Sequence, residues 1–281
     1  MRRWIRPLVL LLALFCLLGV TFRSDVKSDS LKLYFFDVGQ GDAILLRTRE
    51  GDILIDAGSE QSEQLLCLRL EQIGVTQLKL AIFTHFDEDH IGGADAVLRS
   101  FPAKTVWVSH AHPEGEAAER MLLAADECGA EICRVYTGAK FELGELFLMA
   151  VLPFTKTPDE GNEGSVAVRM QYGDVSALFM GDAGEKQEAV LVERYGPSQL
   201  DVDLCKLGHH GSKTASSRAF LECTSPQYAV ISCDAVNSYG HPSGEVLARL
   251  REIRATICCT AWQGEIVFES DGKRLFYKFS G

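Results

Sequence analysis

The chain has 281 residues, enough for one large domain or two small ones. Hydrophobic residues make up 47% and charged residues 24% of the sequence, which is typical of a globular protein and excludes a disordered chain or a multi-span membrane protein. Asp and Glu outnumber Lys and Arg by 39 to 28, so the formal net charge is −11. This acidic balance argues against a broad surface for nucleic-acid phosphates, although bound metal cations can supply positive charge locally.

The first 23 residues differ from the rest of the chain. Arg2, Arg3 and Arg6 precede an uncharged apolar run over residues 7–20. This pattern is typical of a signal peptide or an N-terminal membrane anchor, and we favour either over a buried core helix. The remaining body is therefore expected to be extracytoplasmic, either secreted or held at the membrane by this segment alone.

Cysteine is frequent, with nine residues in the chain. Eight remain when Cys16 of the N-terminal segment is set aside, and outside the cytoplasm an even number permits disulfides. Several lie in apolar strand-like runs, as Cys205 and Cys258 do, so buried free thiols are the favoured interpretation.

Residues 31–281 are expected to form one domain in which short apolar strands alternate with helices. Strands are predicted at 31–36, 43–47, 53–55, 80–84, 105–108, 146–151, 166–171, 177–180, 228–231 and 265–268. Helices are predicted around residues 66–73 before Gly74, at 116–128 before Gly129, and at 246–253 after the N-cap Ser243. Strands interleaved with helices indicate a layered α/β domain.

One short pattern occurs twice. A Gly51-Asp52 turn leads through a strand to Asp56-Ala57-Gly58, and a Gly173-Asp174 turn leads through a strand to Asp182-Ala183-Gly184. Gly-Asp is a common turn pair, so chance is one explanation. The other is an internal two-fold repeat, which would place Asp56 and Asp182 at comparable strand ends.

The strongest signal is the run from His85 to His90, which follows an apolar strand. Asp89 and His90 are adjacent and can bind one metal ion, while His85 and Asp87 can turn together toward a second. An exposed polar loop would explain the acidic residues but not two histidines beside a buried strand. The run therefore predicts a metal site.

Later strand ends supply further candidate ligands. Asp182 has two carboxylate oxygens that can bridge two cations, although an ordinary turn aspartate is the alternative. At least one of His209 and His210 is expected to bind metal, because two adjacent imidazoles would be unusual in a core. His241 lies in a turn after a strand, where a substrate-facing role and an ordinary loop position are equally compatible with the sequence.

Together these motifs resemble the metallo-β-lactamase superfamily. The run His85-x-Asp87-x-Asp89-His90, followed by Ile91-Gly92-Gly93, is similar to its signature, with Asp87 at the position usually held by a second histidine. Residues 36–42, 181–182, 209–212 and 237–242 resemble more specifically the extracytoplasmic hydrolase domain of the competence protein ComEC and its stand-alone relatives. The resemblance covers the chain from about Leu31 to near its C-terminus. It implies a four-layer αββα sandwich with a dinuclear metal site at its open edge, without the ComEC membrane channel.

The resemblance also implies ligands for two divalent ions. One ion is expected on Asp89, His90 and one of the paired histidines, with Asp182 as a bridge. The other is expected on His85, Asp87 and Asp182. Because this set is rich in carboxylates, manganese is expected as readily as zinc.

Relatives place the ligand histidine just before a small residue. This pattern favours His210 as the direct ligand and leaves His209 as its neighbour or as a proton donor. Asp56 is expected to orient a ligand rather than to bind metal.

The resemblance implies an exported dinuclear metal-dependent hydrolase. The favoured activity is that of a phosphodiesterase or nuclease acting on DNA or on a cell-surface phosphodiester. Asp89, His209 and His241 are the expected catalytic residues, with Asp89 orienting the attacking water. The acidic charge favours a small or short substrate, and a monomer is expected. The alternative is a catalytically silent binding module of a DNA-uptake or cell-surface assembly, which would bind no metal.

Overall fold

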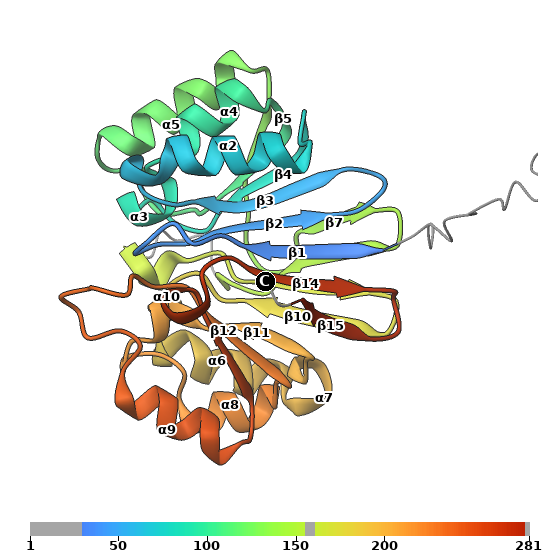
Figure 1. Cartoon of the computed structure of the whole chain (residues 1–281), viewed down its shortest axis with the longest axis vertical. Coiled ribbons are helices and arrows are strands. Elements are labelled where there is room, and N and C mark those ends of the chain that lie inside the picture. The colour runs from blue at the N-terminus through green and yellow to red at the C-terminus, as the bar shows by residue number, and fades with distance from the viewer. Residues whose placement is uncertain (1–29, 155–160, 279–281) are drawn as a thin grey trace, which may run out of the picture.

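Two β-sheets pack face to face, and helices cover the outer face of each, so that the protein has four layers (Figure 1). The computed structural model describes residues 30–154 and 161–278. The αββα sandwich expected from the sequence is therefore confirmed. The N-terminal segment 1–23, expected to direct export, lies outside the described residues.

The first sheet has eight strands in the order β15-β14-β1-β2-β3-β4-β5-β6. They are β1 (Leu31–Phe35), β2 (Ala43–Arg47), β3 (Asp52–Ala57), β4 (Leu78–Phe83), β5 (Ala103–Val108), β6 (Glu131–Arg134), β14 (Ile266–Ser270) and β15 (Leu275–Lys278). Its outer face is covered by α2 (Glu63–Ile73), α4 (Ala94–Ser100) and α5 (Glu116–Glu127), and the short α3 (Glu88–Ile91) lies at one edge.

The second sheet has seven strands in the order β13-β12-β11-β10-β9-β8-β7. They are β7 (Lys140–Leu143), β8 (Leu146–Ala150), β9 (Val168–Tyr172), β10 (Val175–Phe179), β11 (Leu204–Lys206), β12 (Tyr228–Ile231) and β13 (Thr256–Cys259). Helices α6 (Glu185–Tyr195), α8 (Arg218–Thr224) and α9 (Gly244–Glu252) cover this sheet, with the shorter α7 (Pro197–Leu200) and α10 (Thr260–Gln263) beside them.

The pairing of the strands confirms the internal repeat. In the first sheet β2 and β3 form an antiparallel hairpin, after which β4, β5 and β6 add in parallel. In the second sheet β9 and β10 form the equivalent hairpin, and β11, β12 and β13 add in parallel. The two Gly-Asp turns join the strands of these hairpins, so Asp56 and Asp182 do lie at equivalent strand ends.

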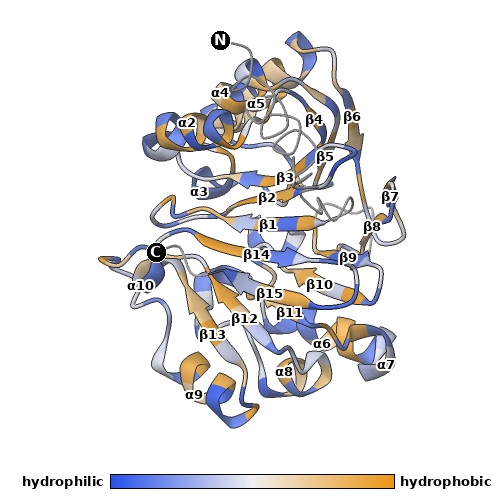
Figure 2. Ribbon diagram, turned by 45° about the vertical axis from the view of Figure 1, so that its right-hand side comes forward, coloured by the Kyte–Doolittle hydropathy of each residue, from blue (hydrophilic) through white to orange (hydrophobic). Residues whose placement is uncertain are grey.

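Apolar side chains fill three layers, one between the sheets and one under each helical layer. Figure 2 shows this pattern as hydrophobic strands and helices with one hydrophobic side. Phe35 and Phe179 face each other across the central layer, with ring centroids 6.3 Å apart. Burial of such side chains stabilises the sandwich by roughly 25 cal/mol per Å² of apolar surface.

The local signals for helix ends act as expected. Ser243 Oγ accepts a hydrogen bond from Val246 N at the start of α9, and Gly74 ends α2 with a left-handed φ of 87°. The predicted strand at 166–171 instead begins at Val168, because Val166 N donates to Thr84 O in the other sheet. The eight cysteines of the described chain are free thiols.

No helix within residues 30–154 and 161–278 is long and apolar enough to cross a membrane.

Candidate metal centre

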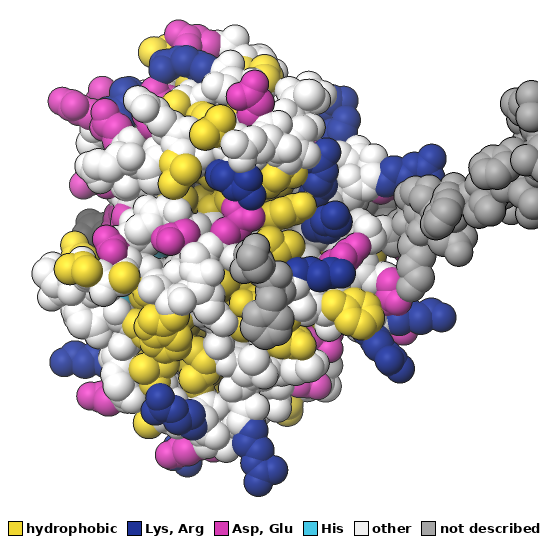
Figure 3. Space-filling model, viewed as in Figure 1, with side chains coloured by type: hydrophobic (Ala, Val, Ile, Leu, Met, Phe, Trp, Pro, Cys, Tyr) yellow, Lys and Arg dark blue, Asp and Glu magenta, His cyan; other side chains and the backbone are white. Residues whose placement is uncertain are grey.

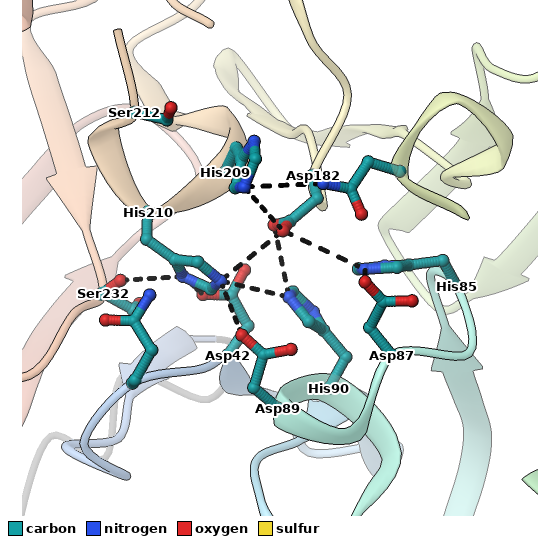
Figure 4. Close-up of polar contacts among 12 residues, drawn as sticks. Asp42, His85, Asp87, Asp89, His90, Asp182, His209, His210, Ser212 and Ser232 are labelled. Carbon is teal, nitrogen blue, oxygen red and sulfur yellow. Dashed lines mark hydrogen bonds and ion pairs between the residues drawn. The ribbon is translucent and has the colours of Figure 1, made fainter. Parts of the chain in front are cut away.

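The predicted ligands meet where parallel strands of both sheets end. His85 follows β4, and α3 then carries Asp89 and His90. From the second sheet, Asp182 follows β10 and His210 follows β11. Parallel strands end at the same edge, so three separate segments, around residues 85–90, 182 and 210, bring their side chains together (Figure 4).

One half of the centre contains two imidazoles and two carboxylates. His90 Nε2 lies 3.3 Å from His210 Nε2 and 3.2 Å from Asp182 Oδ1. His210 Nε2 lies 3.2 Å from Asp89 Oδ2 and 3.6 Å from Asp182 Oδ2. The side chains expected to bind the first ion therefore lie within 3.2–3.6 Å of one another in these four pairs of atoms.

The other half is formed by His85 and Asp87. His85 Nε2 lies 3.6 Å from Asp87 Oδ2 and 3.9 Å from Asp182 Oδ2. Asp182 thus faces both halves, which is the arrangement of a bridging ligand. Asp87 is half-exposed, so this half opens to solvent.

Hydrogen bonds fix the tautomer of the three inner histidines. His90 Nδ1 donates to Asp56 Oδ2 at 2.8 Å. His85 Nδ1 lies 3.0 Å from Thr84 Oγ1, whose own proton goes to Asp56 Oδ2 at 2.8 Å. His210 Nδ1 donates to Ser232 O at 3.0 Å. In the neutral form of each ring, Nε2 therefore carries the lone pair and faces the centre, and this is the form that binds a metal.

The paired histidines lie in strained backbone. His209 has φ 50° and ψ 47°, and His210 has φ 52° and ψ 27°. Left-handed conformations cost about 1–2 kcal/mol per residue without glycine. Two such residues in succession turn both rings toward the centre, which is a typical use of strain at a functional site.

His209 and His241 lie at the rim. His209 Nε2 is 3.9 Å from Asp182 Oδ2 and 3.4 Å from Asn162 Nδ2, and its side chain is 31% exposed. The rings of His209 and His241 are 5.7 Å apart, and Tyr239 stacks on His241. Burial lowers the pKa of both histidines. The sequence-based choice of His210 over His209 as the inner ligand fits this placement, while the catalytic roles of His209 and His241 stay predictions.

Charge at the centre is set by carboxylates. Burial opposes a charge on His210 and His90, but Asp182 outweighs it, raising the pKa of His210 to about 9 and the pKa of His90 well above its usual value. Burial also acts to raise the pKa of Asp182, yet His210 and His90 hold it well below its usual range. The buried carboxylates create a negative potential that favours a cation.

Buried polar atoms without a hydrogen-bond partner indicate whether the centre fits metal ions. His85 Nε2 and Asp182 Oδ1 are buried and have no hydrogen-bond partner within the described chain. Buried polar groups without a partner are costly, and these two are a ring nitrogen and a carboxylate oxygen of the predicted ligands. The residues present therefore fit divalent cations.

One residue of this region received no role in the sequence-based prediction. Asp42, just before β2, is 1% exposed, and its ligand atom lies within 4.8 Å of those of His90, Asp182 and His210. Burial acts to raise the pKa of Asp42, but Lys206 and His210 hold it well below its usual range. In the sequence, Asp42 is the last residue of the run 36–42 that resembles the ComEC-like hydrolase domain, and it follows the Gly39-Gln40-Gly41 turn.

A groove of about 750 Å³ adjoins the exposed side of the centre. Asp87 and Asp89 form one wall, and Asp37, Asp234 and Tyr239 lie among its other lining residues. No Lys or Arg is among the described residues that line it. Any anionic substrate in this groove therefore depends on bound cations for its positive charge.

Comparison with known proteins relates most of the sandwich to one family. A family model described as "Metallo-beta-lactamase superfamily" matches residues 36–235. The chain is 28% identical over 250 residues to ComE operon protein 3 of Bacillus subtilis, covering 83% of this chain and 32% of that protein. It is 32% identical over 262 residues to competence protein ComA of Neisseria gonorrhoeae, covering 92% of this chain and 35% of that protein. The chain thus spans about a third of the length of these relatives.

The fold is similar to that of solved structures as well. The metallo-beta-lactamase fold protein YhfI from Bacillus subtilis superposes with a TM-score of 0.57 at 11% identity, covering 86% of this chain and 100% of that chain. At this level of identity the comparison concerns the fold alone.

Proposed function

Because the chain belongs to the metallo-beta-lactamase superfamily, whose fold is generally that of metal-dependent hydrolases, we propose that it hydrolyses a phosphodiester with two divalent ions. One observation carries the proposal. Three imidazole Nε2 atoms with fixed tautomers and the carboxylates of Asp87, Asp89 and Asp182 converge at one edge of the sandwich. Divalent ions held there would activate water and neutralise the negative charge that develops on the ester.

Individual side chains have distinct expected tasks. Asp182 holds both halves of the centre together, since it faces His85 on one side and His90 and His210 on the other. Asp89 is 31% exposed and borders the groove, so its free oxygen can orient the attacking water. For His209, whose side chain is 31% exposed beside Asp182, the expected task is to give a proton to the leaving group.

A short phosphodiester is favoured over a long nucleic acid. The groove beside the centre is lined by acidic residues, which would repel a polyanion beyond the reach of the metal ions. On the face drawn in Figure 3, Lys and Arg side chains lie at several separate places and form no continuous stripe. The names of the relatives, with "competence" in one of them, make DNA a candidate, and a short single strand or a cell-surface phosphodiester fits the charges of the groove.

Export belongs to the same proposal. The arginines and apolar run of residues 1–20 are typical of a segment that delivers the domain outside the cytoplasm, as a secreted or anchored protein. In that compartment the domain would have access to a cell-surface phosphodiester or to DNA that is being taken up.

A substrate panel tests the proposed reaction. Full-length protein supplied with Mn²⁺ or Zn²⁺ should hydrolyse bis(p-nitrophenyl) phosphate and short single-stranded DNA, and should act more slowly on long duplex DNA. Asp89→Asn should reduce turnover more than metal content, because the amide keeps the shape but loses the charge that orients water. Activity on lactones or thioesters but on no phosphodiester would contradict the substrate class. Inactivity of metal-loaded protein on all of them would favour a binding module.

A further inference from the structure

We propose that Asp42 and Lys206 form a positioning pair, which holds His210 and Asp89 in place without binding a cation itself. The inference rests on the proposed metal site. It concerns two residues that lie outside the metal-ligand motifs.

The pair is a buried ion pair between the two sheets. Lys206, the last residue of β11, has a fully buried side chain, and its Nζ donates to Asp42 Oδ2 at 2.6 Å and to Leu207 O at 3.0 Å. Asp42 lies directly before β2, 164 positions away along the chain. Either charge alone would be costly in this environment, so the two are stable only together.

Asp42 contacts both groups of ligands. Its Oδ1 lies 3.6 Å from His210 Nδ1, and its backbone N donates to Asp89 O at 3.2 Å. The preceding Gly41 allows this approach, because a Cβ at that position would lie 2.2 Å from Asp89 O. One residue thus connects a ligand from the first sheet with a ligand from the second.

The position of the carboxylate also suits an electronic effect on His210. Asp42 Oδ1 is buried and has no hydrogen-bond partner among residues 30–154 and 161–278. It faces the N–H side of the His210 ring, whose Nε2 faces the centre. A carboxylate on that side of an imidazole makes the opposite nitrogen a stronger donor.

The competing explanation is that Asp42 is itself a ligand, since it lies among the four clustered donor residues. Two contacts argue against it. The Lys206 ammonium already binds one oxygen of this carboxylate, Oδ2, and its positive charge would repel a divalent cation. Asp42 also faces His210 Nδ1, which donates to Ser232 O, and not Nε2, which faces the metal centre. The two explanations predict opposite changes in metal affinity when Lys206 is removed. If Asp42 is a ligand, metal should bind more tightly. If Asp42 positions other ligands, it should lose its own position and metal should bind more weakly.

The test uses full-length protein and three variants, Lys206→Met, the double variant Asp42→Leu/Lys206→Met, and the control Lys104→Met at an exposed lysine near the start of β5. Mn²⁺ affinity is measured by calorimetry, ligand geometry by the visible spectrum of Co²⁺-loaded protein, and stability by thermal unfolding. We expect the first two variants to lower affinity at one site by roughly 10- to 100-fold and to shift the Co²⁺ spectrum. The double variant should regain most of the Tm lost in Lys206→Met, because no buried charge is left unpaired. The control should match wild type.

Two results would overturn the inference. Tighter Mn²⁺ binding by Lys206→Met would make Asp42 a ligand. Wild-type affinity and spectrum in the double variant would make the pair purely structural, and this variant decides the question if Lys206→Met does not fold. Wild-type protein that binds none of Mn²⁺, Zn²⁺ or Co²⁺ would instead remove the proposed metal site on which the inference rests.

Discussion

Asp56 Oδ2 accepts a hydrogen bond from His90 Nδ1 at 2.8 Å, and the same oxygen accepts the hydroxyl proton of Thr84 at 2.8 Å. Asp56 therefore orients His90 directly and His85 through Thr84 Oγ1, which lies 3.0 Å from His85 Nδ1. One buried carboxylate at the end of β3 therefore orients the rings of two predicted metal ligands. The sequence predicts this orienting role for Asp56, and its effect on metal binding is a prediction.

Asp56→Asn should weaken metal binding by roughly 10- to 100-fold, because an amide offers one acceptor oxygen where three donors now bind. Calorimetric titration with Mn²⁺ or Zn²⁺ measures this. Asp203→Asn is a matched control, since Asp203 also accepts a backbone N–H, from Ser176 at 2.8 Å, but does so away from the centre. Unchanged metal affinity in Asp56→Asn would contradict the orienting role.

Asp182→Ala should remove both ions, because this side chain faces both halves of the centre. Asp87→Ala is the comparison within the site, and it should weaken only the ion beside His85. Elemental analysis after desalting gives the number of ions per chain. If Asp182→Ala keeps both ions, Asp182 is only a turn residue.

His241→Ala should leave the metal content unchanged and lower kcat. His241 lies beside His209 at the rim, and its contacts do not include the carboxylates of the centre. Steady-state kinetics with metal analysis of the same sample separates the two effects. Loss of a metal ion, or wild-type turnover, would exclude a substrate-facing role.

Stability should depend on pH through Asp52, which lies at the start of β3. Burial raises its pKa to about 6, with Arg47 and Lys79 acting in the opposite direction. The folded state then binds this proton more tightly than the unfolded chain, whose Asp pKa is about 3.9, so stability falls as the pH rises from about 4 through 6.

Asp52→Asn should therefore raise the Tm by roughly 2–4 °C at about pH 7.5 and leave it unchanged near pH 4, a shift expected for about 1 kcal/mol in a domain of this size. Arg47 keeps a partner in this variant, because its Nη1 also donates to Ile73 O at 2.6 Å. Asp174→Asn, at the exposed equivalent position of the repeat, should have no effect at either pH. A lower Tm of Asp52→Asn at about pH 7.5 would show that the Arg47 contact outweighs burial.

Fractionation of cells that express a tagged chain should place the domain outside the cytoplasmic membrane, as residues 1–20 predict. Added protease should degrade it in intact cells while a cytoplasmic marker survives. A full-length soluble pool in the cytoplasm would exclude export.

Most strands and the helices α2, α5 and α9 could be predicted because their signals are local, whereas α6, which is as long as α2, was missed. The apolar runs, the Ser243 cap and the glycine after α2 each act within a few residues. Strands β6 and β7 escaped prediction because both lie at sheet edges with half-exposed, charged sequences such as Lys140-Phe141-Glu142-Leu143. Each pairs with one neighbouring strand, β6 with β5 and β7 with β8, and so lacks the apolar run of a central strand.

The candidate site divides in the same way. Residue type and spacing are enough to predict Asp87, Asp89 and the histidines at positions 85, 90, 209 and 210 as site residues. The structure brings all of them to one edge of the sandwich. The pair of Asp42 and Lys206 could not be predicted in this way. In the sequence Lys206 is one polar residue in an apolar strand, and its partner lies 164 positions away. Only the packing of the two sheets makes them neighbours.

The most direct test of the central claim is the number of divalent ions bound by purified full-length protein, measured by elemental mass spectrometry after incubation with Mn²⁺ or Zn²⁺ and desalting. The geometry of His85, Asp182 and His210 predicts about two ions per chain, with none after treatment with EDTA. A correctly folded protein that retains no ion at any concentration tested would contradict the proposed metal centre and the hydrolytic function built on it.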